Sequence, residues 1–240
     1  METLDVAMTS APRRAVAAEW DARVESWRST CAGPAFLRFR DRALDAAALR
    51  ATDRVLDVGC GTGLLALAAA GLADSVVALD VSPRMLLEVQ SAADARGLRN
   101  LSVVCADAAQ LPLASDGMDC VMSSYALHHL DHRAKLAALA EARRVLRPGG
   151  RLVVVDMMFS LSMRAQDRAI ILGKARQILR KGPSGAVRLV RNAVRIGSGR
   201  WEHPAPRDWW LDAATMMGFT DVVVVPLEQE AGMLTAVRPE

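Results

Sequence analysis

The sequence has few aromatic side chains and no paired cysteines. Aromatic residues make up 4% of the 240 residues, and Tyr125 is the one tyrosine. This disfavours a nucleic-acid surface, because such surfaces interleave basic side chains with aromatic rings that stack on bases. None of the cysteines stands in a C-x-x-C pair. We therefore expect free, mostly buried thiols in a reducing cytoplasm. The four cysteines are Cys31, Cys60, Cys105 and Cys120.

Long apolar runs are also missing. Apolar residues make up 52% of the chain, but it contains no run of about 18 of them, the length that spans a bilayer. The first residues, METLDVAMTSAPRR, lack the continuous apolar stretch of a secretory signal. We therefore expect one cytoplasmic domain of ordinary size without a transmembrane segment.

The chain does contain a glycine loop placed directly after an apolar segment. Residues 55–63 read VLDVGCGTG. The apolar residues of 55–58 predict a buried parallel strand. Gly59, Gly61 and Gly63 permit a sharp turn and a close approach of the backbone to a ligand. The segment therefore predicts a ligand-binding loop at the end of a strand.

A carboxylate inside that strand indicates which ligand the loop accepts. Asp57 is flanked by apolar residues, where a carboxylate without a partner is costly. Loops that bind dinucleotides follow G-x-G-x-x-G and place pyrophosphate at a helix N-terminus. Here Leu64 stands at the position of the third glycine, and Asp57 would repel pyrophosphate. The pattern favours the ammonium end of S-adenosylmethionine over a dinucleotide. A loop that only turns the chain is the third interpretation.

Strands and helices alternate along the rest of the chain, which predicts a doubly wound parallel sheet. Ser82 followed by Pro83 predicts the start of one helix, and Asp131 predicts the start of another. Pro148-Gly149-Gly150 is expected to separate that second helix from the fifth strand. Two final strands without a helix between them predict a closing antiparallel hairpin. The expected strands are 54–58, 75–80, 102–105, 119–123, 151–155, 222–225 and 234–237, with helices at 64–70, 83–96, 131–144 and 207–217.

Further side chains fall at the carboxyl ends of these strands, where ligands of open α/β sheets bind. Asp80 can accept hydrogen bonds from both ribose hydroxyls, although an acid at a helix N-terminus is the alternative. Met85 is placed to cover an adenine face or to fill the core. Asp107-Ala108 could accept from the adenine amino group, and Ser124 would line the methionine side.

With these motifs the sequence resembles the class I S-adenosylmethionine-dependent methyltransferases. Its motifs are similar to those of the group that includes the ubiquinone and menaquinone C-methyltransferases and many small-molecule methyltransferases. The resemblance rests on VLDVGCGTG at 55–63, ALDVSPRML at 79–87, CADAAQLPL at 105–113, GMDCVMSSYALHHL at 117–130 and ARRVLRPGGRLVVVD at 142–156. It does not cover residues 1–50 or 157–205, where this group usually builds its acceptor pocket.

The resemblance implies a Rossmann-like α/β fold with a doubly wound, mostly parallel seven-stranded sheet and a final antiparallel strand. It also implies S-adenosylmethionine as co-substrate, and it matches Thr62, Asp80, Asp107-Ala108 and Ser124 to donor-binding positions. Together with the loop, the candidate donor-binding residues are Asp57, Gly59, Gly61, Thr62, Gly63, Asp80, Val81, Met85, Asp107, Ala108 and Ser124.

Candidate catalytic residues follow the fourth strand. A sulfonium methyl group is already activated, so a base is needed only when the acceptor arrives protonated with a high pKa. His128 and His129 are candidate bases, with packing or surface positions as the alternative, and Tyr125 could orient the acceptor. The spacing of His128 and His132 also allows a zinc interpretation. No cysteine or further ligand stands nearby in the sequence, so we expect no metal.

Two segments outside the motifs, residues 1–50 and 157–205, have different expected roles. Residues 1–50 are expected to form an N-terminal helical cap on a methyltransferase domain at 51–240. That domain includes a basic helical insert at 157–205. Between Ser160 and Arg200 stand ten Lys or Arg and one acid. This insert could roof the acceptor site and attract an anionic small molecule, form a solvated face, or bind nucleic acid or a membrane surface. A nicotinamide-dependent oxidoreductase and a donor-binding protein without catalysis are the alternative functions.

Overall fold

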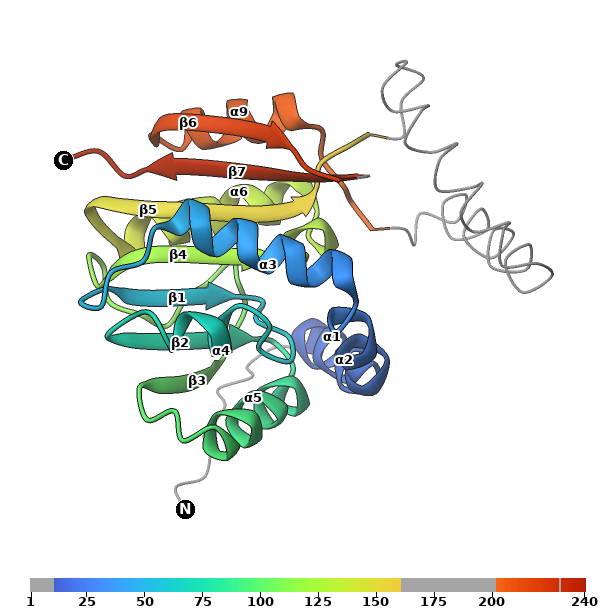
Figure 1. The fold of residues 1–240 in the computed structure, drawn as a ribbon. Coiled ribbons are helices and arrows are strands. Elements are labelled where there is room, and N and C mark those ends of the chain that lie inside the picture. The colour runs from blue at the N-terminus through green and yellow to red at the C-terminus, as the bar shows by residue number, and fades with distance from the viewer. Residues whose placement is uncertain (1–10, 161–201, 229) are drawn as a thin grey trace.

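The protein, described by a computed structural model, folds around one seven-stranded sheet (Figure 1). The structure describes residues 11–160, 202–228 and 230–240. Most of the expected basic insert, 161–201, therefore lies outside the described residues. The strands are β1 Arg54–Val58, β2 Ser75–Asp80, β3 Leu101–Cys105, β4 Met118–Ser124, β5 Leu146–Met157, β6 Thr220–Pro226 and β7 Ala231–Val237. The helices are α1 Ala11–Asp21, α2 Val24–Cys31, α3 Pro34–Ala47, α4 Ala66–Ala69, α5 Pro83–Ala95, η1 Leu127–His129, α6 His132–Val145 and α9 Arg207–Met216.

The sheet has the order β3-β2-β1-β4-β5-β7-β6. The five strands from β3 to β5 are parallel, and β7 is antiparallel to both β5 and β6. This confirms the expected doubly wound, mostly parallel fold with a final antiparallel strand. The reversal of strand order lies between β1 and β4, at the position where open α/β sheets bind ligands.

Helices cover both faces of the sheet, as Figure 1 shows with α3, α4 and α5 in front and α6 and α9 behind. Successive strand residues point to opposite faces. Val55 accordingly belongs to the apolar core under α3 to α5, and Leu56 to the core under α6 and α9. Trp210 of α9 is completely buried in the second core. The strand segments are nearly continuous apolar sequences because the strands are buried on both faces.

The expected helix starts are confirmed. The Ser82 hydroxyl accepts a hydrogen bond from Met85 N at 3.1 Å, and Pro83 is the first residue of α5. The Asp131 carboxylate accepts from Ala134 N at 2.8 Å at the start of α6. Both side chains satisfy a backbone N–H that the helix itself leaves unpaired.

Several expected boundaries are wrong, including the starts of β6 at Thr220 and of β7 at Ala231. The α4 helix is shorter than expected, beginning at Ala66 instead of residue 64 and ending in Ala70 as its C-cap instead of Gly71. The β5 strand already begins at Leu146 and includes Pro148-Gly149-Gly150, which were expected to precede it. The reason is pairing with the chain that follows β7. Gly149 N donates to Arg238 O at 2.8 Å, and Arg238 N donates to Gly150 O at 2.9 Å.

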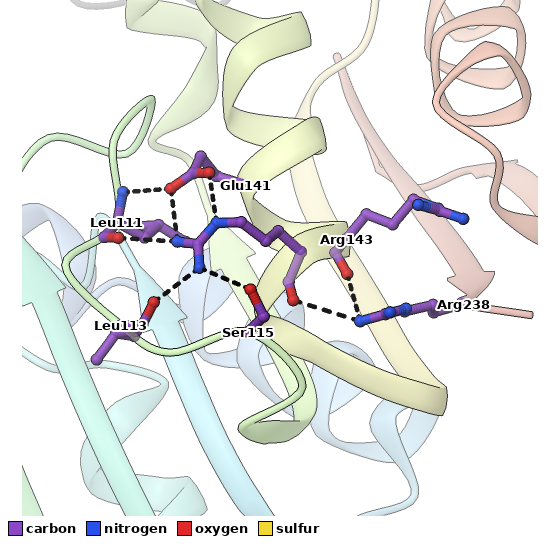
Figure 2. A network of polar contacts seen from close by, with 7 residues as sticks. Leu111, Leu113, Ser115, Glu141, Arg143 and Arg238 are labelled. Atoms are coloured by element: carbon purple, nitrogen blue, oxygen red, sulfur yellow. Dashed lines mark hydrogen bonds and ion pairs between the residues drawn. The ribbon is translucent and has the colours of Figure 1, made fainter. Parts of the chain in front are cut away.

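A polar network anchors the loop between β3 and β4 (Figure 2). The Arg144 guanidinium donates to Leu111 O at 2.9 Å, to Leu113 O at 2.8 Å and to the Glu141 carboxylate. Glu141 in turn accepts from Leu111 N at 2.7 Å. These contacts fix to α6 the loop that carries Asp107. No helix among residues 11–160, 202–228 and 230–240 is long and apolar enough to cross a membrane.

Candidate functional site

A cavity of about 520 Å³ lies at the carboxyl ends of the parallel strands. Its volume is within the range of small-molecule sites. It is lined by residues that follow β1, β2, β3 and β4 and by side chains of α1 and α2. The structure brings together in its wall nine of the fourteen candidate site residues: Gly59, Gly61, Asp80, Val81, Met85, Asp107, Ala108, Tyr125 and His129.

The glycine loop has the backbone that its sequence requires. Gly59 has φ +70° and Gly61 has φ +52°, a region that costs other residues strain. A Cβ on Gly59 would lie 2.3 Å from Ala126 Cβ, and one on Gly61 would lie 2.5 Å from Trp27 Nε1. Side chains larger than hydrogen therefore do not fit at either position.

The third glycine of the motif has a packing role in this structure. A Cβ on Gly63, which has φ +88°, would contact Leu67 and Val89 at 3.0–3.1 Å. Thr62 is half-buried in the turn. Neither Gly63 nor Thr62 lines the large cavity, so their assignment to the donor stays a prediction.

Asp80, at the end of β2, joins the glycine loop to α5. One carboxylate oxygen accepts from Gly61 N and the other from Ser82 N, each at 2.9 Å. Burial raises the pKa of Asp80, while these backbone hydrogen bonds oppose the rise. Each carboxylate oxygen can accept two hydrogen bonds. Asp80 therefore keeps acceptor capacity for hydroxyl groups in the cavity that it lines.

Asp57 lies deeper, beside a second and much smaller cavity that also contacts Ser124 and Trp27. Its carboxylate accepts from Ala66 N at 2.9 Å and so caps α4. Burial is the main cause that raises the pKa of Asp57 to about 7, and the nearby Asp80 charge adds to it. The Ser124 hydroxyl is buried without a hydrogen-bond partner among the described residues. A donor-rich or cationic group would satisfy both.

Two further candidates, Met85 and Asp107, also line the cavity. The Asp107 carboxylate accepts from Ala109 N at 2.8 Å, which holds the turn after β3. Met85 is buried at the start of α5 and lines the cavity.

The two histidines after β4 have different surroundings. His129 lines the large cavity. His128 is buried, and its Nδ1 lies 2.5 Å from Asp156 Oδ1, while its backbone N donates to Asp156 Oδ2 at 3.0 Å. The two imidazole centroids are 3.9 Å apart. Asp156 at the end of β5 thus fixes the His128 ring, a role that the sequence analysis did not predict.

Tyr125 lies in an aromatic cluster next to these histidines. Its ring stacks on Phe39 with centroids 5.4 Å apart and is tilted against Phe36 at 4.9 Å. Its φ is +52°, an unusual value for a bulky residue. Burial raises the pKa of the Tyr125 hydroxyl, so it stays protonated and serves as a hydrogen-bond group.

The N-terminal helices contribute side chains that the sequence analysis left without a role. Trp20 of α1 and Trp27 of α2 line the large cavity. Trp20 also contacts the His129 ring edge-on at a centroid distance of 4.6 Å. Asp21 ties α1 to α5 by accepting from the Ser82 hydroxyl at 2.5 Å and from Arg84 N at 3.1 Å. Two tryptophans seven positions apart are unusual in a chain so poor in aromatic residues. This spacing was the feature of the sequence that could have predicted their place in the cavity wall.

The sequence-based zinc interpretation paired His128 with His132, and the structure separates them. His132 packs against Trp209 at a centroid distance of 4.9 Å. The residue that approaches the histidine pair is Glu202, which lies beyond the undescribed segment.

Comparisons with known proteins agree on one family. Residues 55–150 match the model of a methyltransferase domain. The chain is 32% identical over 169 residues to an uncharacterized methyltransferase of Mycobacterium bovis, covering 70% of this chain and 75% of that one. It is 41% identical over 122 residues to a demethylmenaquinone methyltransferase of Thermus thermophilus, covering 50% of this chain and 54% of that one. Matches to the first curated relatives thus span about half of their length.

Among solved structures, the [4+2]-cyclase SpnF superposes with a TM-score of 0.68 at 19% identity, covering 93% of this chain and 95% of that one. This similarity shows the fold alone. The family assignment instead rests on the sequence matches, the strand order and the glycine loop together. The chain belongs to the class I S-adenosylmethionine-dependent methyltransferase family.

Proposed function

We propose that this protein transfers the methyl group of S-adenosylmethionine to a small-molecule acceptor, at oxygen or carbon. The observation that carries the proposal is the wall of the large cavity, where Asp80 meets the positive-φ glycines of the loop. A carboxylate beside a close-approach loop suits a ribose and a cationic amino acid end. It does not suit a pyrophosphate. Family membership also favours this function over the nicotinamide-dependent oxidoreductase kept as an alternative.

We assign each part of the donor to a group of residues in or beside the cavity. Asp80 would accept from the ribose hydroxyls, and Met85 with Asp107 and Ala108 would hold the adenine. Asp57 and Ser124, in the adjoining small cavity, would receive the ammonium end, since both are buried with unused acceptor capacity. S-adenosylmethionine supplies a methyl group already activated by its sulfonium charge. The protein then contributes mainly orientation and exclusion of water, worth roughly 7–11 kcal/mol.

For a hydroxyl or carbon acid acceptor, we assign proton removal to the histidine pair. With Asp156 ionised, His128 Nδ1–H donates to it, and Nε2 is the nitrogen left to accept a proton. His129 lines the cavity beside it and is held edge-on by Trp20. The proton lost by the acceptor would pass to this pair as the bond to the methyl carbon forms. Tyr125 would donate a hydrogen bond to the acceptor from the cavity wall.

Two observations bear on the acceptor class. Relatives at about 40% identity over half of this chain are named demethylmenaquinone methyltransferases, which favours a quinol-like aromatic acceptor. The basic segment 160–200 favours an acceptor with an anionic group, such as a phenolate or carboxylate. Both features agree on a phenolic small molecule.

The test is transfer of radiolabelled methyl from S-adenosylmethionine to a panel of quinols, catechols and phenolic acids. We expect labelled product from at least one phenolic class, with adenosylhomocysteine formed in equal amount. Donor binding without transfer to any acceptor class would instead favour the donor-binding protein without catalysis. Hydride transfer from a nicotinamide cofactor would support the oxidoreductase alternative and contradict the proposal.

A further inference from the structure

Three potential metal ligands meet beside the cavity, at His129. One ligand atom each of His128, His129 and Glu202 lie within 4.8 Å of one another. The two histidines are adjacent in η1, while Glu202 is separated from them by more than seventy positions in the chain. This meeting is therefore a product of the fold and not of local sequence.

The backbone holds Glu202 at this place. His203 N donates to His128 O at 2.7 Å, and His203 O accepts from Lys135 Nζ at 2.6 Å. Lys135 is itself fully buried in α6 and also donates to Leu130 O. Residue 202 is thus pinned on the histidine pair by hydrogen bonds on both sides of its neighbour. A site with fixed ligands loses little entropy on binding an ion.

Asp156 completes the arrangement. Histidines that bind metals usually donate their second ring N–H to a carboxylate, which fixes the ring and raises its basicity. His128 Nδ1 lies 2.5 Å from Asp156 Oδ1, so Nε2 is the nitrogen left for an ion. Two imidazoles and one carboxylate are also the ligand set of catalytic zinc sites that keep a fourth position open.

We propose that His128, His129 and Glu202 bind a divalent transition-metal ion, with Zn²⁺ as the reference ion. Zinc ligands bind at about 2.0–2.2 Å and hence lie roughly 3–4 Å apart. Small side-chain rotations close the difference from 4.8 Å. The site borders the cavity through His129. This inference replaces the sequence-based expectation of no metal, because Glu202 supplies the ligand that the sequence did not place.

One consequence rests on the proposed function. An ion at this site takes the imidazole lone pairs that would otherwise accept the acceptor's proton. Metal binding and base catalysis by the histidine pair are therefore mutually exclusive. Zn²⁺ should inhibit methyl transfer, and removal of the ion by a chelator should restore it.

The test measures Zn²⁺ affinity of the full chain by competition with a chromophoric chelator, without donor or acceptor present. Glu202→Gln should weaken the affinity at least about tenfold, and Asp156→Asn should weaken it by about 10–100-fold. His132→Gln is the matched control, because this histidine packs on Trp209 away from the cluster. It should retain wild-type affinity. Co²⁺ should give the visible absorption of a four-coordinate site in the wild type and lose it in Glu202→Gln.

Each outcome decides the proposal. Equal Zn²⁺ affinity in wild type and Glu202→Gln, with both folded by circular dichroism, would overturn the site. Binding at the free cysteines would show the same affinity in both proteins and counts as that result. Wild-type binding with no inhibition of methyl transfer would overturn the competition with the base. Because the affinity is measured without substrates, a failure of the proposed function leaves this measurement unaffected.

Discussion

The two halves of the cavity are built in different ways. The half proposed for the donor, with Gly59, Gly61, Asp80 and Asp107, uses backbone shape and carboxylates at the carboxyl ends of β1, β2 and β3. The proposed acceptor half combines Tyr125 and His129 of the cavity wall with three residues grouped behind them: His128, Asp156 and Glu202. The first half would recognise one ligand, the methyl donor, by the shape of the backbone. In the second half, a single substitution can add or remove a group that binds a proton.

This difference has a physical origin. Positive-φ glycines against Ala126 and Trp27 leave no room for variation in the loop. The acceptor half depends instead on contacts between chain segments, such as His128 with Asp156 and His203 with His128. Substitutions in the donor half should therefore act on donor affinity, whereas those in the acceptor half should act on turnover.

The largest effect is expected from removal of both imidazoles. His128→Ala with His129→Ala should lower turnover by about 10²–10⁴-fold, the range for a lost general base, while donor affinity stays within a few-fold. The pH–rate profile should also lose its ascending limb near neutrality. Near-normal turnover in a folded double variant would show that orientation alone drives the reaction.

A comparable but separate loss is expected from the glycine loop. Gly61→Val places atoms where Trp27 Nε1 lies 2.5 Å from an added Cβ, so donor affinity should fall more than about 100-fold. Gly97→Val is the control, because Gly97 has φ +68° and nothing within 4 Å of an added Cβ. If both variants bind the donor equally well in calorimetric titration, close approach at Gly61 is unimportant.

Asp80→Ala should weaken donor binding by roughly tenfold to a hundredfold, because a hydrogen bond to a charged group contributes about 1.5–3 kcal/mol. The variant also removes the bonds to Gly61 N and Ser82 N. Asp94→Ala, on the outer part of α5, is the control for loss of an acid. Unchanged affinity in a folded Asp80 variant would remove this residue from the ribose site.

A further effect concerns pH. The pKa of Asp57 is raised to about 7 by burial, so the folded state holds a proton that the unfolded state releases near pH 4. Its contribution to stability is present at low pH and is lost as pH rises from about 4 through 7.

A cationic donor end favours the charged carboxylate. Donor affinity should therefore rise with pH below about 7, approaching tenfold per unit. Asp57→Asn should flatten that slope. An unchanged slope in the variant would place the ammonium elsewhere.

The sequence predicted features that depend on near neighbours. Ser82, Pro83 and Asp131 mark helix starts because their effect extends over three residues. The turn at the glycine loop and the place of Asp80 at the end of a strand could be predicted for the same reason. The start of β5 could not, because it depends on pairing with Arg238 far along the chain.

Long-range assembly also hid parts of the site. The sequence places Asp156 at the end of a strand but does not indicate its partner. The fold brings it to His128. Trp27 reaches the cavity, and Glu202 reaches the histidine pair, from segments outside the family motifs. Side chains that join a site through tertiary contacts leave no periodic or local pattern in the sequence.

The most direct measurement is calorimetric titration of the wild-type protein with S-adenosylhomocysteine and, separately, with NAD⁺. We expect saturable binding of one adenosylhomocysteine per chain, with no detectable heat of binding for NAD⁺. Binding of NAD⁺ with no response to adenosylhomocysteine would contradict it.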